Sequence, residues 1–245
     1  MKVELLACTP NPMKTMFSAW THTMPCELPD PQSVYDKLWD RWVVEPTSAL
    51  EFVHLSFLLL GVSRAFLAQI TRHRMLGFWV QSMRTTDMSN FEFEVPDGLT
   101  PKQRMEYKLS MRNIQDCYRG LLDLKVPLEI ARDVIPLGSP TNIAVAGNLR
   151  AWAGLIRSRA CLMAQQGVWA PVLREMHRLM VEVEPRFDDL FNTPCHYTGE
   201  CPYRHEQQDR IAKGGPGFRT QPSLGVCPVY LTKFGPDSPS RAAEA

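Results

Sequence analysis

An apolar run in the first quarter of the chain limits its possible folds most strongly. Between Phe52 and Leu60 every second residue is apolar, and the residues between them become apolar as well. A period of two over this length is typical of a β-strand, and the apolar second face indicates burial on at least one side. Ser63 then stands where an N-cap is expected, before a helix predicted from about Arg64 to His73. The chain is therefore expected to pass from a buried strand almost directly into a helix.

The remaining periodic segments are mainly helical. A short strand is expected over residues 1–8 and a short helix over 36–43. Further helices are predicted from Lys102 to Leu124, from Pro127 to Arg132, from Asn148 to Gly167 and over Val172–Val183. Because strands and helices do not alternate strictly, the expected fold class is α+β, a small sheet with several helices. Residues 206–245 are rich in Gly, Pro and polar residues, and we expect an irregular tail there.

Charge and cysteine content limit the binding partners and the cellular compartment expected for the protein. The net charge of +1 gives no general reason to expect nucleic acid or an anionic membrane as a partner. The longest apolar stretch is interrupted by Ser63 and Arg64 and is too short to span a bilayer. The seven cysteines are odd in number and scattered, and the first residues lack a signal-peptide pattern. These features predict a reduced, cytoplasmic protein without nucleic-acid or membrane partners.

The strongest chemical signal is a cluster of cations after the predicted helix. Arg72, His73 and Arg74 are followed by Ser82 and Arg84 within thirteen residues. Guanidinium groups bind phosphate oxygens through paired, charge-assisted hydrogen bonds, and an apolar flank weakens the screening of their charge by water. The segment therefore indicates a site for an anion.

The same residues admit a plainer interpretation, a last helical turn whose cations complement the helix dipole. An Arg-His-Arg triplet by itself favours that interpretation. However, Gln69, Arg72 and His73 fall at i, i+3 and i+4, so a helix reaching His73 would place them on one face. An amide, a guanidinium and an imidazole are costly to bury without partners. Together with Ser82 and Arg84, this grouping favours the anion site.

The order of these residues resembles the signature of the flavin-dependent thymidylate synthases, Arg-His-Arg-x-x-Ser-x-Asn-x-x-Ser-x-Arg. In segment 72–84, Gly77 replaces the first Ser and Trp79 replaces the Asn, while the five remaining fixed positions match. Similar family elements are Gly61-Val62-Ser63-Arg64-Ala65, Ala131-Arg132 through Pro136, Asn148-Leu149-Arg150, Arg159 with Ala164-Gln165, and Pro194-Cys195 through Cys201-Pro202. The resemblance covers about residues 1–205, which we expect to form one catalytic domain.

The resemblance implies a fold, a reaction and a set of site residues. The family methylates C5 of a pyrimidine nucleotide, with FAD as redox cofactor, methylene-tetrahydrofolate as carbon donor and NADPH as reductant. It also implies a homotetramer with active sites shared between subunits, and no metal. The residues implied to contact FAD are Arg72, His73, Arg74, Asn148 and Arg150. The residues implied to contact the nucleotide are Gln69, Ser82, Arg84, Arg132 and Arg159, with Arg159 and Ser82 in catalytic roles.

The chain departs from the family pattern at the signature itself. Replacing Ser by Gly77 and a polar residue by Trp79 removes polar groups beside the expected nucleotide. We hypothesise that the change admits a ribose 2′-hydroxyl, so that UMP, dUMP or both are substrates. In this respect the chain is similar to family members that methylate UMP or dUMP in nucleoside-antibiotic biosynthesis of the polyoxin type.

The residues alone leave several functions open. Taken singly, Arg132 or Arg159 is a surface charge more often than a ligand. Also compatible with the residues are a thiol nucleophile, a nucleotide- or RNA-binding module, and a family member that retains the fold as an inactive scaffold. A zinc site would have as its candidate ligands Cys195, His196, Cys201 and His205. The spacing of the two cysteines does not match a zinc knuckle, and bound flavin would decide between the enzyme and the binding module.

Overall fold

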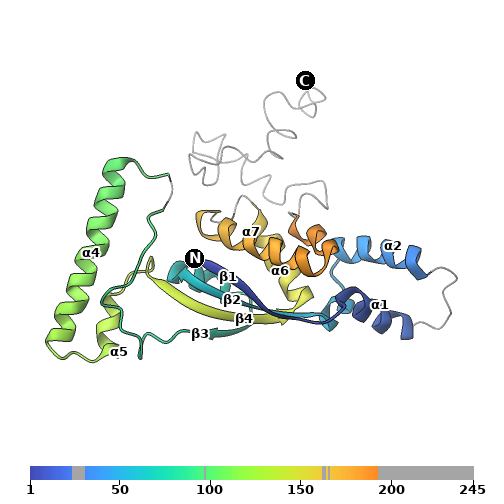
Figure 1. Ribbon diagram of the computed structural model, residues 1–245, viewed down its shortest axis with the longest axis horizontal. Helices are drawn as coiled ribbons and strands as arrows, with labels where there is room; N and C mark the ends of the chain where they lie inside the picture. Colours follow the sequence, from blue (N-terminus) through green and yellow to red (C-terminus); the bar gives the residue numbers. More distant parts are fainter. Residues whose placement is uncertain (24–30, 97, 162–163, 165, 193–245) are drawn as a thin grey trace, which may run out of the picture.

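An antiparallel sheet with helices packed on it forms the centre of the molecule (Figure 1). The computed structural model describes residues 1–23, 31–96, 98–161, 164 and 166–192. Over these residues the sheet has four strands in the order β1-β2-β4-β3. The strands are β1 (Lys2–Cys8), β2 (His54–Ser63), β3 (Gly77–Val80) and β4 (Pro140–Asn148). The helices are α1 (Pro12–His22), α2 (Pro31–Val44), α3 (Arg64–Ile70), α4 (Pro101–Asp123), α5 (Leu128–Ala131), α6 (Leu149–Ala160) and α7 (Gln166–Val183). Short 3-10 turns cover Ser48–Phe52, Arg132–Val134 and Pro185–Phe191.

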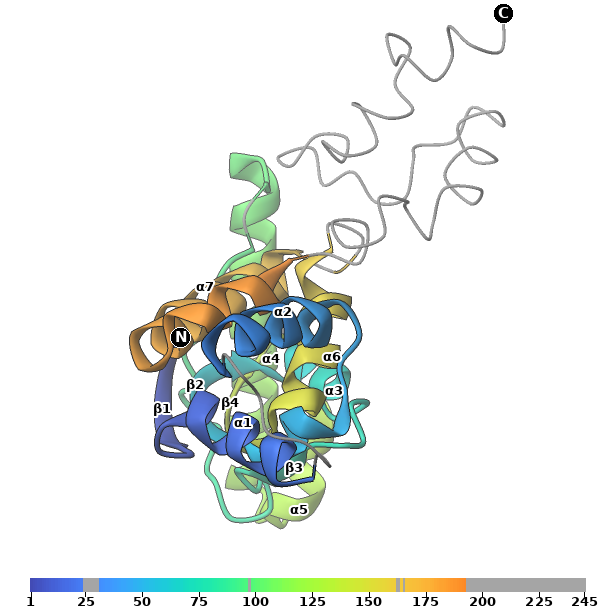
Figure 2. The same ribbon diagram turned by 90° about the vertical axis from the view of Figure 1, so that its right-hand side faces the viewer.

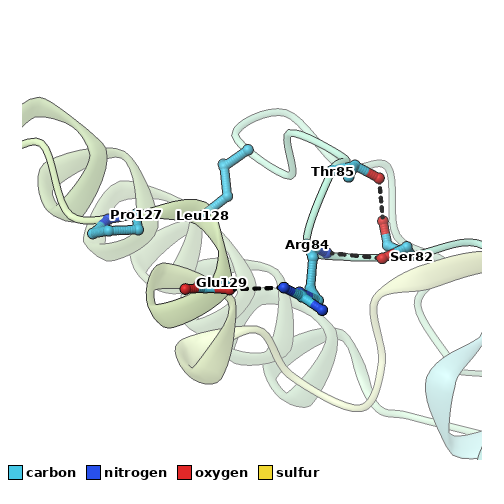
Figure 3. A pocket seen from close by; sticks show the side chains of 6 residues that line it. All are labelled: Ser82, Arg84, Thr85, Pro127, Leu128 and Glu129. Atoms are coloured by element: carbon cyan, nitrogen blue, oxygen red, sulfur yellow. Dashed lines mark hydrogen bonds and ion pairs between the residues drawn. The ribbon is translucent and has the colours of Figure 1, made fainter.

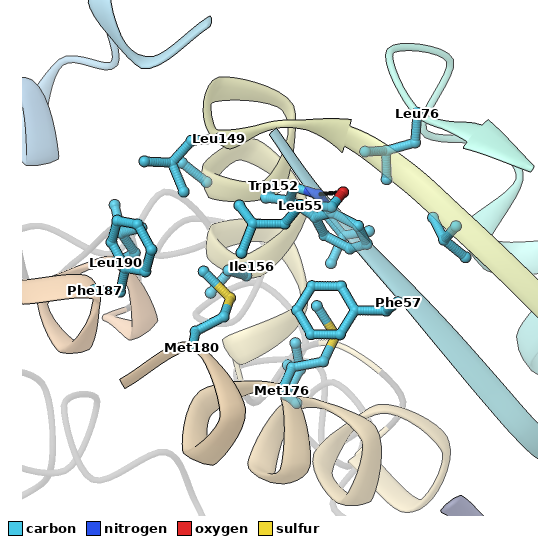
Figure 4. Packing of buried hydrophobic residues seen from close by; sticks show 14 of the residues in the cluster. Leu55, Phe57, Leu76, Leu149, Trp152, Ile156, Met176, Met180, Phe187 and Leu190 are labelled. Atoms are coloured by element: carbon cyan, nitrogen blue, oxygen red, sulfur yellow. Dashed lines mark hydrogen bonds between the residues drawn. The ribbon is translucent and has the colours of Figure 1, made fainter. Parts of the chain in front are cut away.

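Helices α6 and α7 cover one face of the sheet, and the main core lies between them and the strands (Figures 1 and 2). Alternate residues of β2, among them Leu55 and Phe57, are fully buried and point toward these helices (Figure 4). The ring of Phe57 meets the edge of Trp152 at 5.1 Å, and the Trp152 Nε1–H donates to the Leu55 carbonyl oxygen at 3.2 Å. A buried indole needs such an acceptor, so this bond fixes α6 against the strand.

The opposite face of the sheet stays partly exposed within one chain. The cross-strand register pairs Glu4 with Leu58, Leu58 with Ala144, and Ala144 with Trp79. Because directly paired residues point to the same side of a sheet, these four side chains form one row. Trp79 is 83% exposed and Leu6 of the edge strand is 54% exposed. Apart from Glu4 the row is apolar, and with the exposed Trp79 it forms a surface suited to a partner.

Helices α4 and α5 form an arm beside the sheet, seen at the left of Figure 1. The arm has its own small core, built on Met88, Phe91, Met111 and Tyr118. A capping box opens α4, because the Thr100 side chain accepts from the Gln103 backbone while the Gln103 side chain accepts from the Thr100 backbone. The arm is therefore anchored by local interactions and by the segments that lead back to β3 and β4.

The structure confirms the α+β class and most of the expected elements. Ser63 caps α3 as predicted, since its Oγ accepts from the Phe66 backbone at 3.1 Å. The helix expected over 148–167 ends earlier, because Cys161 adopts an extended backbone, and α7 begins at Gln166. The helix expected over 36–43 is longer and begins at Pro31.

One α-helix and two strands were absent from the sequence prediction, α1, β3 and β4, as were the 3-10 turns at Ser48–Phe52 and Pro185–Phe191. Strand β4 alternates Thr141, Ile143 and Val145 toward the core with small residues on the opposite face. The segment before β4, Pro136-Leu137-Gly138, was interpreted only as the end of the preceding helix.

One prediction about local geometry was wrong. Helix α3 ends at Ile70, so Gln69, Arg72 and His73 do not share a helical face. The backbone N–H of His73 bonds to the Ile70 carbonyl oxygen at 3.0 Å, in a turn. The chain must reverse here because Gly77 pairs with Ala146 in the sheet. The expected tail, residues 206–245, and the Cys and His residues at 195–205 lie outside the described residues.

No described helix is both long enough and apolar enough to cross a bilayer.

Candidate functional site

Helix α3 carries a polar side chain of the resembled family motifs near each end. Its seven residues at about 1.5 Å each separate the two ends by about 10 Å. Arg64 lies at the start of the helix and Gln69 near its end. The residues implied by the family resemblance lie near or after the end of α3, after β3, after α5 and at both ends of α6.

The first group gathers four side chains from three segments, and we call it the Trp169 cluster: Gln69, His73, Arg159 and Trp169. The Trp169 Nε1–H donates to Gln69 Oε1 at 2.7 Å. The Arg159 guanidinium carbon lies 4.8 Å from the centre of the Trp169 ring. Arg159 Nε–H also donates to His73 Nε2 at 3.2 Å. Three residues expected in the site thus come together around a tryptophan that the sequence reasoning had not included.

The hydrogen bond from Arg159 fixes the state of His73. A guanidinium nitrogen only donates, so His73 Nε2 must accept, and the ring is neutral with its proton on Nδ1. Burial lowers the pKa of His73, and the positive charge of Arg159 lowers it further. Near neutral pH His73 therefore acts as an uncharged acceptor toward Arg159.

The second group lines a cavity of about 420 Å³ between β3 and α5 (Figure 3). Arg84 points across it, and its Nη2 lies 3.2 Å from Glu129 Oε2. The Ser82 Oγ accepts from the Arg84 backbone N–H at 3.2 Å, and this bond holds the turn that carries both residues. Both expected residues, Ser82 and Arg84, lie at this cavity, while Glu129 was not expected.

A further pair of cations, Arg64 and Arg132, lies at the start of α3. Burial, and then the charge of Arg132, lowers the pKa of Arg64. An arginine keeps its charge in proteins even so. Two guanidinium groups held near each other strengthen the local positive potential, which attracts an anion. Arg132 therefore lies near Arg64, which the sequence analysis had named only as part of a family motif.

The start of α6 holds the next two expected residues. The Asn148 side chain caps the helix by accepting from the Ala151 backbone at 2.9 Å. Arg150 pairs with Glu51 at 2.6 Å. The twelve residues of α6 span about 18 Å, so this pair is far from Arg159 at the opposite end of the helix.

The remaining expected residues, Arg72 and Arg74, are exposed between α3 and β3. Beside them Gly77 leaves open space, since an added Cβ would meet only the Ala146 carbonyl oxygen, at 3.7 Å. The exposed Trp79 follows two residues later on the same strand. Cations and a flat aromatic surface are therefore both accessible here.

The single chain does not assemble all expected residues in one place. It brings Gln69, His73 and Arg159 together, and separately Ser82 and Arg84, while Asn148 and Arg150 form a third position. Sequence reasoning missed Trp169, which lies between two of the predicted helices, and Glu129, which appeared as an ordinary helix residue. Among the described residues no three His, Cys, Asp or Glu side chains are close enough to hold a metal ion.

The arrangement is suited to a ligand that carries phosphates and planar rings. Arginines at three positions can neutralise phosphate groups, and guanidinium forks favour them geometrically. The Trp169 cluster presents an amide and a guanidinium, the donors that suit the carbonyl groups of a base.

Comparison with known proteins agrees with this description. Residues 4–186 match the family model Thy1, described as thymidylate synthase complementing protein. The chain is 28% identical over 229 residues to the flavin-dependent thymidylate synthase of Nitratidesulfovibrio vulgaris, with 82% of this chain and 91% of that protein covered. It is 35% identical over 159 residues to the enzyme of the same name from Geobacter sulfurreducens, covering 63% and 68%.

A solved structure is also similar. Thymidylate synthase X from Helicobacter pylori, determined with FAD and dUMP, matches with a TM-score of 0.61 and 20% identity, covering 78% of this chain and all of that one. This likeness supports the fold.

Proposed function

The chain belongs to the flavin-dependent thymidylate synthase family, and from that premise we propose that it methylates C5 of a uridine nucleotide. The observation that carries the proposal is the gathering of Gln69 and Arg159 in the Trp169 cluster, with Ser82 and Arg84 together at the cavity beside α5. In the overall reaction the methylene carbon of methylene-tetrahydrofolate forms a bond to C5, and C5 loses a proton. A hydride from NADPH completes the methyl group, and tetrahydrofolate is released.

The residues proposed to hold FAD fit its chemistry. Arg72 and Arg74 are exposed cations, and Arg150 extends from the start of α6. Guanidinium groups suit a pyrophosphate, and a helix N-terminus also favours an anion. When bound, the flavin supplies the two-electron redox chemistry, while the protein supplies position and electrostatic field.

The nucleotide is proposed to use both groups of residues, which can come from different subunits of a tetramer. Arg84 and Ser82 at the cavity, together with Arg132, would bind its phosphate. A phosphate there competes with Glu129 for Arg84, because both are anions that seek the same guanidinium. In the Trp169 cluster Gln69 and Arg159 would contact the uracil carbonyls, and a cation at those oxygens draws electron density from the ring.

The choice between UMP and dUMP is proposed to depend on Gly77 and Trp79. The structure leaves open space at Gly77, where the family signature carries a serine. That space supports acceptance of the ribose 2′-hydroxyl. Turnover of UMP and dUMP by the same preparation tests this, and a strict preference for dUMP would reject it.

A homotetramer with shared sites is the proposed assembly. Two features support it: the implied nucleotide residues of one chain lie in separate groups, and the sheet face bearing Trp79 is exposed. Mixing the inactive variants Arg84→Ala and Arg159→Ala should restore part of the activity if one site takes these residues from different subunits. If the mixture stays inactive while both variants form tetramers, the sites are not shared in this way. A cytoplasmic location and a role in nucleoside-antibiotic biosynthesis stay predictions.

The decisive assay follows methyl transfer from labelled methylene-tetrahydrofolate to UMP or dUMP, with FAD and NADPH present. Label in the C5-methyl group supports the proposal. Nucleotide binding without transfer would favour the second candidate, a family member that acts as a nucleotide-binding scaffold, for which the replaced signature residues Gly77 and Trp79 are the specific reason.

A further inference from the structure

Trp169 is fully buried in α7, and it contacts three polar residues from two other segments, α3 with its following turn and α6. It hydrogen-bonds to Gln69, lies beneath Arg159 and meets the His73 ring edge to face at 6.4 Å. We propose that Trp169 is a positioning residue, which sets the orientation of Gln69 and Arg159 for the ligand they bind. For the identity of that ligand as a uridine nucleotide, the inference rests on the function proposed above.

The indole N–H decides how the Gln69 amide is turned. An indole nitrogen only donates, so the amide atom 2.7 Å from it must be the oxygen. The NH₂ end of the amide therefore points away from the indole. Without Trp169 the amide could rotate and present either end, because its two ends are nearly equal in shape. The tryptophan thus selects a donor, which is the group a uracil carbonyl requires.

The face of the same ring holds Arg159. A guanidinium 4.8 Å from an indole centre is attracted by the negative face of the ring. Phe66 supports the indole, with ring centres 4.5 Å apart, so the indole plane is fixed against α3. From this position Arg159 reaches His73, and the flexible side chain is held in one direction. Among the described residues, the charged group that acts on His73 is Arg159 from α6, and Arg72 and Arg74 are its neighbours in sequence.

Trp152 shows what a purely structural tryptophan looks like in this fold. It is equally buried, but its Nε1–H bonds to a backbone carbonyl, and its ring packs on Phe57. Trp169 differs because its hydrogen bond goes to a polar side chain expected in the site. The two residues therefore form a matched pair for mutation.

The test compares Trp169→Phe, Trp169→Leu and Trp152→Phe in the full-length protein with FAD. Trp169→Phe keeps an aromatic face and removes the hydrogen bond. We expect dUMP affinity to fall about five- to tenfold, as for loss of one hydrogen bond, with FAD content retained. Trp152→Phe should leave dUMP affinity unchanged although it removes a comparable bond from the core. Equal losses of dUMP affinity in the two Phe variants, matching their losses in melting temperature, would mean that Trp169 is only structural.

The NMR titration of the His73 imidazole gives a second test of the proposal, and it needs no nucleotide. The imidazole NMR titration of His73 should be unchanged in Trp169→Phe. In Trp169→Leu the aromatic face is lost, Arg159 leaves His73, and the pKa should move up toward 6.5. An unchanged titration in Trp169→Leu would overturn the claim for Arg159. If the wild-type protein binds neither FAD nor dUMP, the proposed function fails, while this titration still decides whether Trp169 positions Arg159.

Discussion

Replacing Arg84 by alanine should separate nucleotide binding from both flavin binding and stability. Arg84 reaches across the cavity to Glu129, and the two side chains are 65% and 54% exposed. An ion pair with that exposure contributes about 0–1 kcal/mol to stability, so the free energy of unfolding should change little. The turn itself is held by the Arg84 backbone N–H, which the substitution leaves in place.

The expected loss of affinity follows from the bonds to phosphate. A hydrogen bond between charged groups is worth about 1.5–3 kcal/mol, and each 1.4 kcal/mol corresponds to a factor of about ten in affinity. Removal of one such contact should weaken dUMP or UMP binding about ten- to a hundredfold. The nucleotide affinity of Arg84→Lys should lie between those of the wild type and Arg84→Ala, because lysine keeps the charge and loses the planar fork.

The assay is titration of the flavin-loaded protein with nucleotide, followed by the change in flavin absorbance. Arg112→Ala on α4 is the matched control, since it removes an exposed arginine that does not line the cavity. Nucleotide affinity equal to that of the wild type in Arg84→Ala would refute the assignment of the cavity. Loss of FAD in the same variant would also refute it, because the flavin residues are placed elsewhere.

Three further predictions concern the flavin residues, the signature glycine and the histidine. Arg72→Ala should lose flavin absorbance on purification while its circular dichroism stays native, because Arg72 is exposed; normal flavin content would contradict its role. Gly77→Ser should fold normally, since the added Cβ meets only one oxygen at 3.7 Å. It should shift the ratio of UMP to dUMP turnover several-fold toward dUMP, and an unchanged ratio would reject the hypothesis that Gly77 admits the 2′-hydroxyl. Burial and Arg159 lower the pKa of His73, so the unfolded chain binds more protons below about 6.5, and the free energy of unfolding should fall as the pH drops through that window. Urea unfolding at pH 7 and pH 5 measures this fall, which should be smaller in His73→Gln.

Local signals in the sequence were sufficient for the segment from β2 to α3. The alternation of Leu55 and Phe57, and the cap at Ser63, depend on neighbours within a few residues. Strand β4 was missed because its burial depends on pairing with β2, about 85 residues earlier, as in Leu58 with Ala144. The end of α3 was predicted wrongly for a similar reason, because the turn after Ile70 leads the chain into β3, and β3 is fixed by its pairing with β4.

The candidate site was likewise predicted where the sequence carries a direct signal and missed where contacts join distant residues. Resemblance to a family identified Arg84, Gln69 and Arg159 as residues, but not their partners within this chain. The bond from Trp169 to Gln69 joins residues 100 apart, and that from Arg84 to Glu129 joins residues 45 apart. No periodic pattern in a single sequence encodes such contacts, because they arise only when α5 and α7 are placed by the fold.

The visible absorption spectrum of the purified protein, before and after UMP or dUMP is added, tests the central claim most directly. We predict a flavin spectrum that shifts with nucleotide, because the cofactor and the base would lie in one site. A colourless protein that also fails to take up added FAD would contradict the proposed reaction.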